Sequence, residues 1–189
     1  MKLTTRPLTR DLWPAFEDLF GENGAVGGCW CMYWRIGRAY RQKPREENKS
    51  AFREIVERGP PPGLLAFDGD TAALVSADTA GRAAVAGSRV AAQGVDDAPV
   101  WSLSCFYVRK GYRRKGVTET LIGAALSAAR CAKAPALEAY PLDAELTPSA
   151  SGTGYASTFS RAGFKTVARR VPHARLCATN WARNWREEG

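Results

Sequence analysis

The sequence has 189 residues, of which 45% are hydrophobic, and a formal net charge of +8 at neutral pH. We expect one compact domain over residues 1–189 with a sizeable core. No apolar run approaches the ~20 residues that cross a bilayer. The polar first residues, "MKLTTRPLTRD", argue against a secretory signal peptide. The five cysteines lack CxxC spacing, which is typical of reduced thiols in a cytoplasmic protein, and the positive charge leaves nucleic acid, acidic substrates and phosphorylated cofactors open.

The first part of the chain predicts a strand, two helices and a hairpin. A short strand over residues 2–6 precedes a helix that Thr9 can cap, with Pro14 in its first turn. A second helix covers "PREENKSAFREIVERG" and ends at Gly59, and apolar runs on both sides of Asp68-Gly69-Asp70 predict two antiparallel strands. The residues expected to point inward are Leu12, Phe16, Leu19 and Phe20 in the first helix and Ala51, Phe52, Ile55 and Val56 in the second.

The second part of the chain predicts strands mixed with helices on one continuous sheet, which is the α/β class. Residues 77–99 have weak periodicity and are interpreted as a variable loop that can hold a helical turn over 82–86. "VWSLSCFYV" has the pattern of a central strand. The remaining expected elements are an alanine-rich helix over residues 116–133, a strand over 136–140, a loop over 142–153, a helix over 155–162 that Gly163 ends, strands over 164–170 and 174–179, and a tail of uncertain structure.

The stretch "VRKGYRRKGVTETL", residues 108–121, places five cations where a helix begins. The unpaired N–H groups and the dipole at that end favour anions, so a negative ligand is expected there. A Rossmann loop is excluded because no third glycine follows Gly111 and Gly116, and a Walker A loop lacks its lysine because Val117 occupies that position. An exposed basic surface without a specific ligand is the remaining alternative.

The segment "RRKGVT" resembles the pyrophosphate-binding signature [QR]-x-x-G-x-[GA] of the GNAT superfamily of N-acetyltransferases. Arg113 and Gly116 match it, whereas Thr118 departs from the small final residue. The segment follows a predicted central strand and opens an alanine-rich helix, and "FSRAGF" at residues 159–164 resembles the "Y-x-x-x-G-F" end of the family. The order of elements along nearly the whole chain is also similar, and "CWCM", "CFYV" and "EAYP" resemble a bacterial branch of these enzymes.

This resemblance implies a mixed, mostly antiparallel central sheet with a splayed pair of central strands and flanking helices. It also implies acetyl-CoA as co-substrate, an amine of a small molecule or protein as acceptor, no nucleic acid or membrane partner, and a possible homodimer. Backbone N–H groups that glycine leaves accessible would bind the pyrophosphate, and the strand before the loop would pair with the pantetheine arm. The residues assigned to the cofactor are Phe106, Tyr107, Val108, Arg113, Arg114, Lys115, Gly116, Val117, Thr118 and Phe159.

Two residues are candidates for proton transfer. Glu138 lies in an otherwise apolar strand, where burial would raise its pKa into the range of a general base; a salt bridge or a strand-edge position is the alternative. The tyrosine that serves as acid in many family members is replaced by Phe159. Tyr155 lies four residues earlier, one helical turn away, and its hydroxyl can substitute, with plain packing or solvent protonation of the thiolate as alternatives.

The cluster "CWCMYWR" and the remaining reactive side chains give weaker signals. Cys29 and Cys31 make a poor zinc site because four ligands are not in view, so no metal is expected. Trp30, Tyr33 and Trp34 can wall an acceptor pocket, although packing of the first helices is the favoured alternative. We interpret Cys105 as a core residue and His173 as a surface residue. A CoA sensor without catalysis and a nucleic-acid-binding protein remain the alternative functions, but only Tyr112 interleaves with the cations as an RNA-stacking platform requires.

Overall fold

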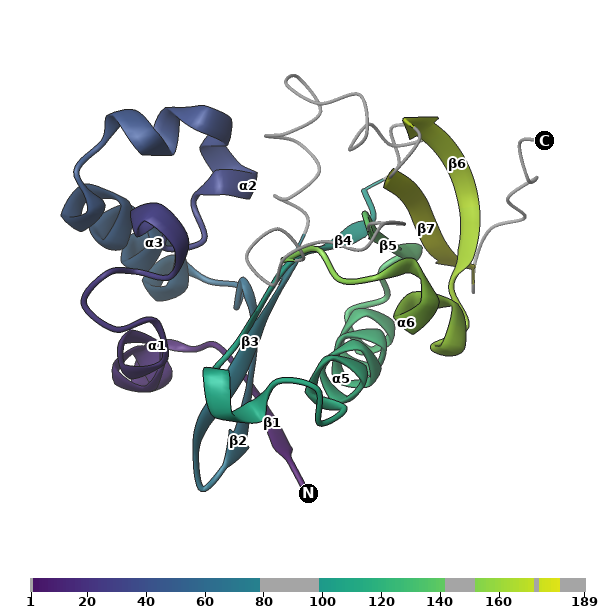
Figure 1. Ribbon diagram of the computed structural model, residues 1–189, viewed down its shortest axis with the longest axis horizontal. Coiled ribbons are helices and arrows are strands. Elements are labelled where there is room, and N and C mark those ends of the chain that lie inside the picture. Colours follow the sequence, from purple (N-terminus) through teal and green to yellow (C-terminus); the bar gives the residue numbers. More distant parts are fainter. Residues whose placement is uncertain (1, 79–98, 142–151, 172–173, 181–189) are drawn as a thin grey trace.

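The computed structural model describes residues 2–78, 99–141, 152–171 and 174–180. Their strands form one seven-stranded sheet in the order β1-β2-β3-β4-β5-β7-β6 (Figure 1). Neighbouring strands are antiparallel except for the parallel pair β4 and β5. The α/β class and the mostly antiparallel sheet are thereby confirmed. The strands are β1 Thr4–Pro7, β2 Gly63–Asp68, β3 Asp70–Asp78, β4 Trp101–Val108, β5 Ala136–Ala139, β6 Lys165–Val171 and β7 Ala174–Asn180.

Helices cover both faces of this sheet (Figure 1). Helices α1 and α3 lie on one side of the strands β2 to β4, and α5 lies on the other. None of the helices in the described ranges is long and apolar enough to cross a membrane. The helices are α1 Trp13–Phe20, α2 Tyr33–Ile36, α3 Arg45–Arg58, α5 Val117–Cys131 and α6 Ala156–Arg161, with the 3₁₀ turns η1 Arg10–Leu12, η2 Val26–Gly28, η3 Gly37–Gln42 and η5 Lys110–Tyr112.

The apolar patterns of the sequence translate into three clusters of buried residues, of which the two larger cover the two faces of β2 to β4 and the third contains Trp34 and Tyr140. In β2, Leu64 and Ala66 pack toward α5, whereas Leu65 packs toward α1 and α3. A strand that is covered on both faces is apolar at consecutive positions, and full burial of a leucine or phenylalanine side chain contributes about 1.5–3 kcal/mol. All four residues expected to point inward from the first helix are buried, and in α3 Phe52 and Val56 are buried while Ala51 and Ile55 are partly buried.

The predicted hairpin and the later elements are confirmed with small shifts of their ends. Asp68 pairs with Asp70 across Gly69, whose φ of 75° only glycine adopts readily. The predicted helical turn over 82–86, the tail from 181, most of the loop over 142–153 and His173 lie outside the described residues.

The feature that positions the site is the divergence of β4 from β5. The two strands pair over three positions, from Trp101–Leu137 to Leu103–Ala139, and β4 then continues to Val108 paired with β3 but no longer with β5. At the same place its register to β3 shifts, because Ser76 pairs with Cys105 and Ala77 with Leu103. One extra residue is therefore inserted in β4, a β-bulge of the kind that bends a strand away from its neighbour. The expected splayed central pair is confirmed.

Candidate functional site

The loop between β4 and α5 has the geometry of an anion-binding turn. Gly116 precedes α5 in the left-handed conformation, with φ 77°, and the first helical bond runs from Thr120 N–H to the Gly116 carbonyl at 3.2 Å. A Cβ atom added at Gly116 would meet nothing within 4 Å. The helix therefore begins beside a glycine whose Cα is uncovered, and the N–H groups of its first turn, at the positive end of the helix dipole, suit a phosphate oxygen.

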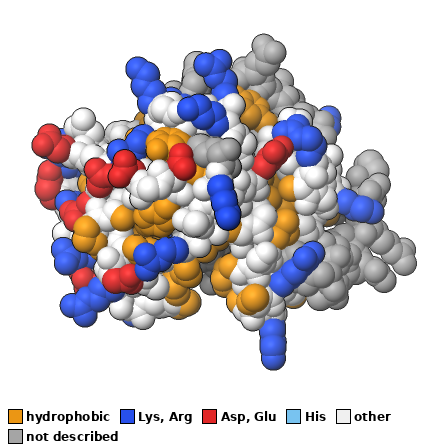
Figure 2. Space-filling view, turned by 90° about the horizontal axis from the view of Figure 1, so that it is seen from below, with side chains coloured by type: hydrophobic (Ala, Val, Ile, Leu, Met, Phe, Trp, Pro, Cys, Tyr) orange, Lys and Arg blue, Asp and Glu red, His pale blue; other side chains and the backbone are white. Residues whose placement is uncertain are grey.

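The five cations of this segment do not all remain available to a ligand. Arg109 forms an ion pair with Asp18 of α1 at 2.5 Å, and the Arg113 guanidinium donates to the Val108 carbonyl at 3.1 Å. Lys115 lies over the Tyr112 ring, 6.0 Å from its centroid, but like Arg114 it is exposed and stays available to a ligand. On the face seen from below Figure 1, Lys and Arg side chains are scattered between apolar patches, and most acidic side chains lie toward the side of α1 and α3 (Figure 2). Sequence reasoning missed Asp18, since an exposed carboxylate in a helix gives no signal of its partner.

The edge of β4 beyond the bulge presents backbone donors to the space that β5 leaves open. Arg109 N–H donates to the Ala72 carbonyl at 3.0 Å, so the alternation of an antiparallel ladder directs the N–H of Tyr107 toward β3 and those of Phe106 and Val108 away from it. Phe106 N–H donates to the Gly152 carbonyl at 2.6 Å. This edge can therefore donate hydrogen bonds to carbonyl oxygens.

Glu138 lies at the start of the splay, inside a short polar network. Its side chain is 0% exposed, and the Tyr140 hydroxyl donates to its Oε2 at 3.2 Å. The Ser102 hydroxyl is 3.4 Å from that of Tyr140, and Ser102 pairs with Glu138 across β4 and β5. Trp34 of α2 stacks on Tyr140, with ring centroids 5.6 Å apart. Sequence reasoning named Glu138 but missed Tyr140, although its position two residues later in an extended strand indicates the same face.

Tyr155 and Phe159 occupy different environments. Tyr155 precedes α6 and is 39% exposed. Phe159 is fully buried, and its ring packs against Phe106 at 6.0 Å and Phe164 at 5.0 Å between centroids. Although Tyr155 and Phe159 are four residues apart, one side chain is exposed and the other is buried, so they do not lie on a common surface. The roles of Tyr155 as acid and of Phe159 beside the cofactor stay predictions.

The tryptophans of the cluster "CWCMYWR" have two different roles. Trp30 is 2% exposed and stacks on Trp13 and Phe20, which is the packing arrangement. A Cβ added at Gly24 would lie 2.0 Å from the Trp30 Nε1, so the indole requires glycine there. Trp34, in contrast, faces the site strands through Tyr140.

Two thiols near the site stay protonated at neutral pH. Burial raises the pKa of the Cys105 thiol to about 12, with a smaller contribution from Cys29. Burial likewise raises the pKa of Cys29, against the opposing effect of the Tyr33 N–H that donates to its Sγ at 3.3 Å. A neutral thiol is a weak nucleophile, and Cys105 is a partly buried residue that packs against the cluster of Trp34 and Tyr140.

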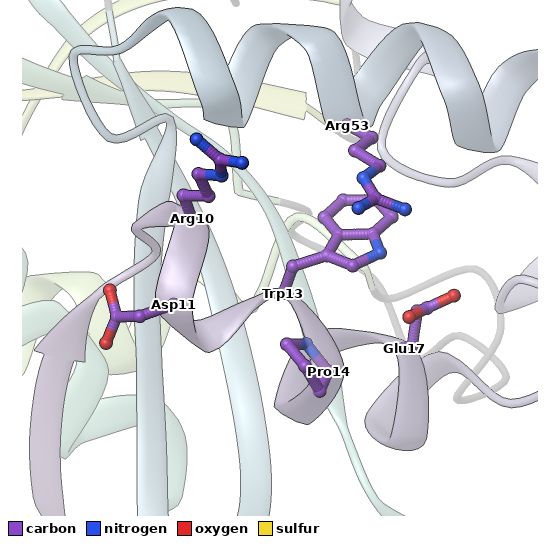
Figure 3. Close-up of a pocket in the computed structure, with 6 residues that line it drawn as sticks. All are labelled: Arg10, Asp11, Trp13, Pro14, Glu17 and Arg53. Atoms are coloured by element: carbon purple, nitrogen blue, oxygen red, sulfur yellow. The ribbon is translucent and has the colours of Figure 1, made fainter.

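A separate surface cavity of about 610 Å³ lies between α1 and α3 (Figure 3). The Arg53 guanidinium lies over the Trp13 ring at 5.7 Å. The two carboxylates that line the cavity already form ion pairs, Asp11 with Arg6 at 3.1 Å and Glu17 with Lys49 at 2.5 Å. This cavity therefore brings together no groups that are set up for proton transfer.

Comparison with known proteins agrees with this geometry. The sequence pattern of the acetyltransferase (GNAT) family matches residues 28–149, roughly two thirds of the chain. This range includes β4, the basic loop, α5 and β5. A search of curated proteins found no match.

Three solved structures with a similar fold are described as N-acetyltransferases. One from Kribbella flavida, described as GCN5-related, has 17% sequence identity and a TM-score of 0.56, with 94% of this chain and 97% of that chain covered. One from Staphylococcus aureus Mu50 has 12% identity and a TM-score of 0.53, with coverage of 95% and 99%. The PaiA N-acetyltransferase from Thermoplasma acidophilum, solved in complex with coenzyme A, has 13% identity and a TM-score of 0.50, with coverage of 96% and 100%. At such identities the similarity concerns the fold alone.

Proposed function

Because the chain belongs to the acetyltransferase (GNAT) family, we propose that it transfers an acetyl group from acetyl-CoA directly to a primary amine of a small molecule or protein. The observation that carries the proposal is the divergence of β4 from β5 directly before a glycine-opened helix N-terminus. This arrangement joins an edge of backbone donors to an anion site. Acetyl-CoA has matching parts, an amide-containing arm and a pyrophosphate.

The residues present suit this co-substrate. The first-turn N–H groups after Gly116 would hold the pyrophosphate, because the bonds within the helix begin only at Thr120 and a Cβ atom added at Gly116 would meet nothing within 4 Å. Arg114 and Lys115, both exposed, would add charge neutralisation. The N–H groups of Phe106 and Val108 would take the carbonyl groups of the pantetheine arm, and Phe106 would first have to exchange the Gly152 carbonyl for that ligand.

Acetyl-CoA supplies an acyl group activated as a thioester. Glu138 would accept a proton from the amine as the nitrogen attacks the thioester carbonyl carbon, so that the C–N bond forms and the C–S bond breaks. The departing thiolate would take its proton from Tyr155 or from water. Tyr140 keeps the Glu138 carboxylate in one orientation through its hydroxyl, and Trp34 holds the Tyr140 ring in place.

The nucleic-acid alternative receives less support. A nucleic-acid surface gathers its cations into a continuous patch or stripe, whereas on the face in Figure 2 they are scattered. Arg109 is engaged by Asp18 as well. We therefore favour an acetyltransferase over a nucleic-acid-binding protein.

The test compares acetyl-CoA binding by calorimetry for the wild type, Gly116→Trp and Gly69→Trp. Gly69 is a matched control, since it is also exposed, has a similar positive φ of 75° and has nothing within 4 Å of an added Cβ, but lies in the β2–β3 turn. Gly116→Trp should abolish binding and Gly69→Trp should retain it. Turnover with a panel of amines then identifies the acceptor. If Gly116→Trp binds acetyl-CoA as tightly as Gly69→Trp does, the cofactor assignment is refuted.

A further inference from the structure

We propose that Ser104 is a further catalytic residue, whose hydroxyl donates a hydrogen bond to the thioester carbonyl oxygen of acetyl-CoA. This inference rests on the proposed function and adds to it a side chain that the sequence pattern did not indicate.

Ser104 stands where β4 leaves β5. The last paired position of the two strands is Leu103 with Ala139, so Ser104 is the first residue of β4 beyond the pairing. It is also the residue that the register shift inserts, since Leu103 pairs with Ala77 and Cys105 with Ser76. Ser104 and Cys105 thus both stand between Leu103 and Phe106, two residues that pack toward α5. Ser104 therefore stands at the point of β4 where the pairing with β5 ends, which is where the acyl-CoA arm would enter.

The Ser104 hydroxyl is buried without a hydrogen bond. Ser104 is 1% exposed, and its Oγ has no hydrogen-bond partner among the described residues. A buried hydroxyl without a partner lowers stability, so such groups in native proteins call for an explanation. The other buried serines of this sheet differ, since the Ser102 hydroxyl contacts Tyr140 at 3.4 Å and that of Ser76 donates to the Pro62 carbonyl at 3.4 Å.

A carbonyl oxygen is the partner that fits this position. The adjacent edge of β4 already binds one carbonyl, since Phe106 N–H donates to Gly152. The thioester oxygen gains negative charge as the amine attacks, and a donor fixed in a water-free position stabilises that charge more than the ground state. The hydroxyl proton stays on Ser104 throughout, while the amine proton passes to Glu138.

The test measures binding of acetyl-CoA and of CoA, which lacks the carbonyl group, to the wild type, Ser104→Ala and the control Ser76→Ala. Ser104→Ala should bind acetyl-CoA about 2–10-fold more weakly, as expected for one hydrogen bond, and should bind CoA as the wild type does. With an acceptor identified from the amine panel, its kcat should fall roughly 10²-fold. Ser76→Ala should change neither affinity.

Thermal unfolding supplies a second signature. Ser104→Ala removes an unsatisfied hydroxyl and should melt at or above the wild-type temperature, whereas Ser76→Ala removes a satisfied one and should melt lower. If Ser104→Ala does not fold, Ser104→Cys replaces it, since a thiol keeps the shape and donates only weakly. Equal losses for acetyl-CoA and CoA, or no loss for either, would overturn the role of Ser104 and leave the proposed function standing. A wild-type protein that binds neither compound would overturn both.

Discussion

Replacement of Asn48 should destabilise the segment that carries Trp34 to the site. Asn48 lies in α3 and is buried, and its amide nitrogen donates to the Gly28 carbonyl at 3.1 Å and to the Tyr40 carbonyl at 2.9 Å. These two residues bracket the stretch that includes α2. One side chain therefore connects α3 to both ends of the segment that positions Trp34 on Tyr140.

The magnitude follows from the partners of the two carbonyls. The Tyr40 carbonyl also accepts from Lys43 N–H at 3.4 Å, so Asn48→Ala should lose there only the net value of a hydrogen bond, about 1 kcal/mol. The buried Gly28 carbonyl loses its side-chain donor, which costs about 1–3 kcal/mol. Alanine returns roughly 0.7 kcal/mol of helix propensity, and it removes the buried Asn48 Oδ1, which has no hydrogen-bond partner among the described residues and whose removal returns about 1 kcal/mol. The expected net loss is about 1 kcal/mol, or a fall in Tm of roughly 2–4 °C for a chain of this size.

Urea unfolding followed by circular dichroism measures this loss, with Glu54→Ala as a control because that side chain is exposed in the same helix. The control should stay within about 0.5 kcal/mol of the wild type. Asn48→Asp should cost at least as much as Asn48→Ala at neutral pH, since a carboxylate then faces two carbonyl oxygens. Burial among these acceptors raises the pKa of that carboxyl above its unfolded value, so stability should recover as the pH falls. A loss below about 0.5 kcal/mol for Asn48→Ala would refute the reasoning.

Glu138→Gln should lower kcat by on the order of 10²-fold and leave acetyl-CoA affinity unchanged, as loss of a general base does; a near-normal rate would mean that positioning of the amine dominates. Tyr155→Phe should slow turnover less, since water can protonate the thiolate, and a normal rate would assign that step to solvent. Cys105, whose pKa burial raises to about 12, should resist iodoacetamide at pH 8 while the exposed Cys131 reacts, as peptide mass spectrometry would measure. Equal labelling of both would contradict the burial argument.

Local patterns predicted the elements that carry periodic apolar residues or glycine at a turn. The buried stripe of α1, the end of α3 at Gly59 and the hairpin at Gly69 follow from backbone preferences within a few residues. The loop before α5 was predictable for the same reason, since Gly116 provides a conformation that other residues avoid.

Contacts between distant segments were not predictable in this way. Nothing near Arg109 or Asp18 in the sequence indicates that they form an ion pair, and Trp34 gives no sign that its stacking partner is Tyr140. Such pairs depend on how α1 and α2 are placed over the sheet, which a single sequence specifies only through the sum of many contacts.

The bulge in β4 shows why the site is harder to predict than the strand that contains it. The alternation of Trp101, Leu103 and Cys105 against Ser102 and Ser104 predicts a regular strand, which would point Phe106 away from the face of Leu103. In the structure Leu103 and Phe106 both pack toward α5, which requires one inserted residue between them. The insertion lies where the pairing with β5 ends, and the Ser104 hydroxyl at this point has no hydrogen-bond partner among the described residues. An unpaired strand edge and an unsatisfied buried hydroxyl are costs to an isolated sheet, and binding of a carbonyl-containing ligand would offset them, so we infer that the irregularity belongs to the proposed site.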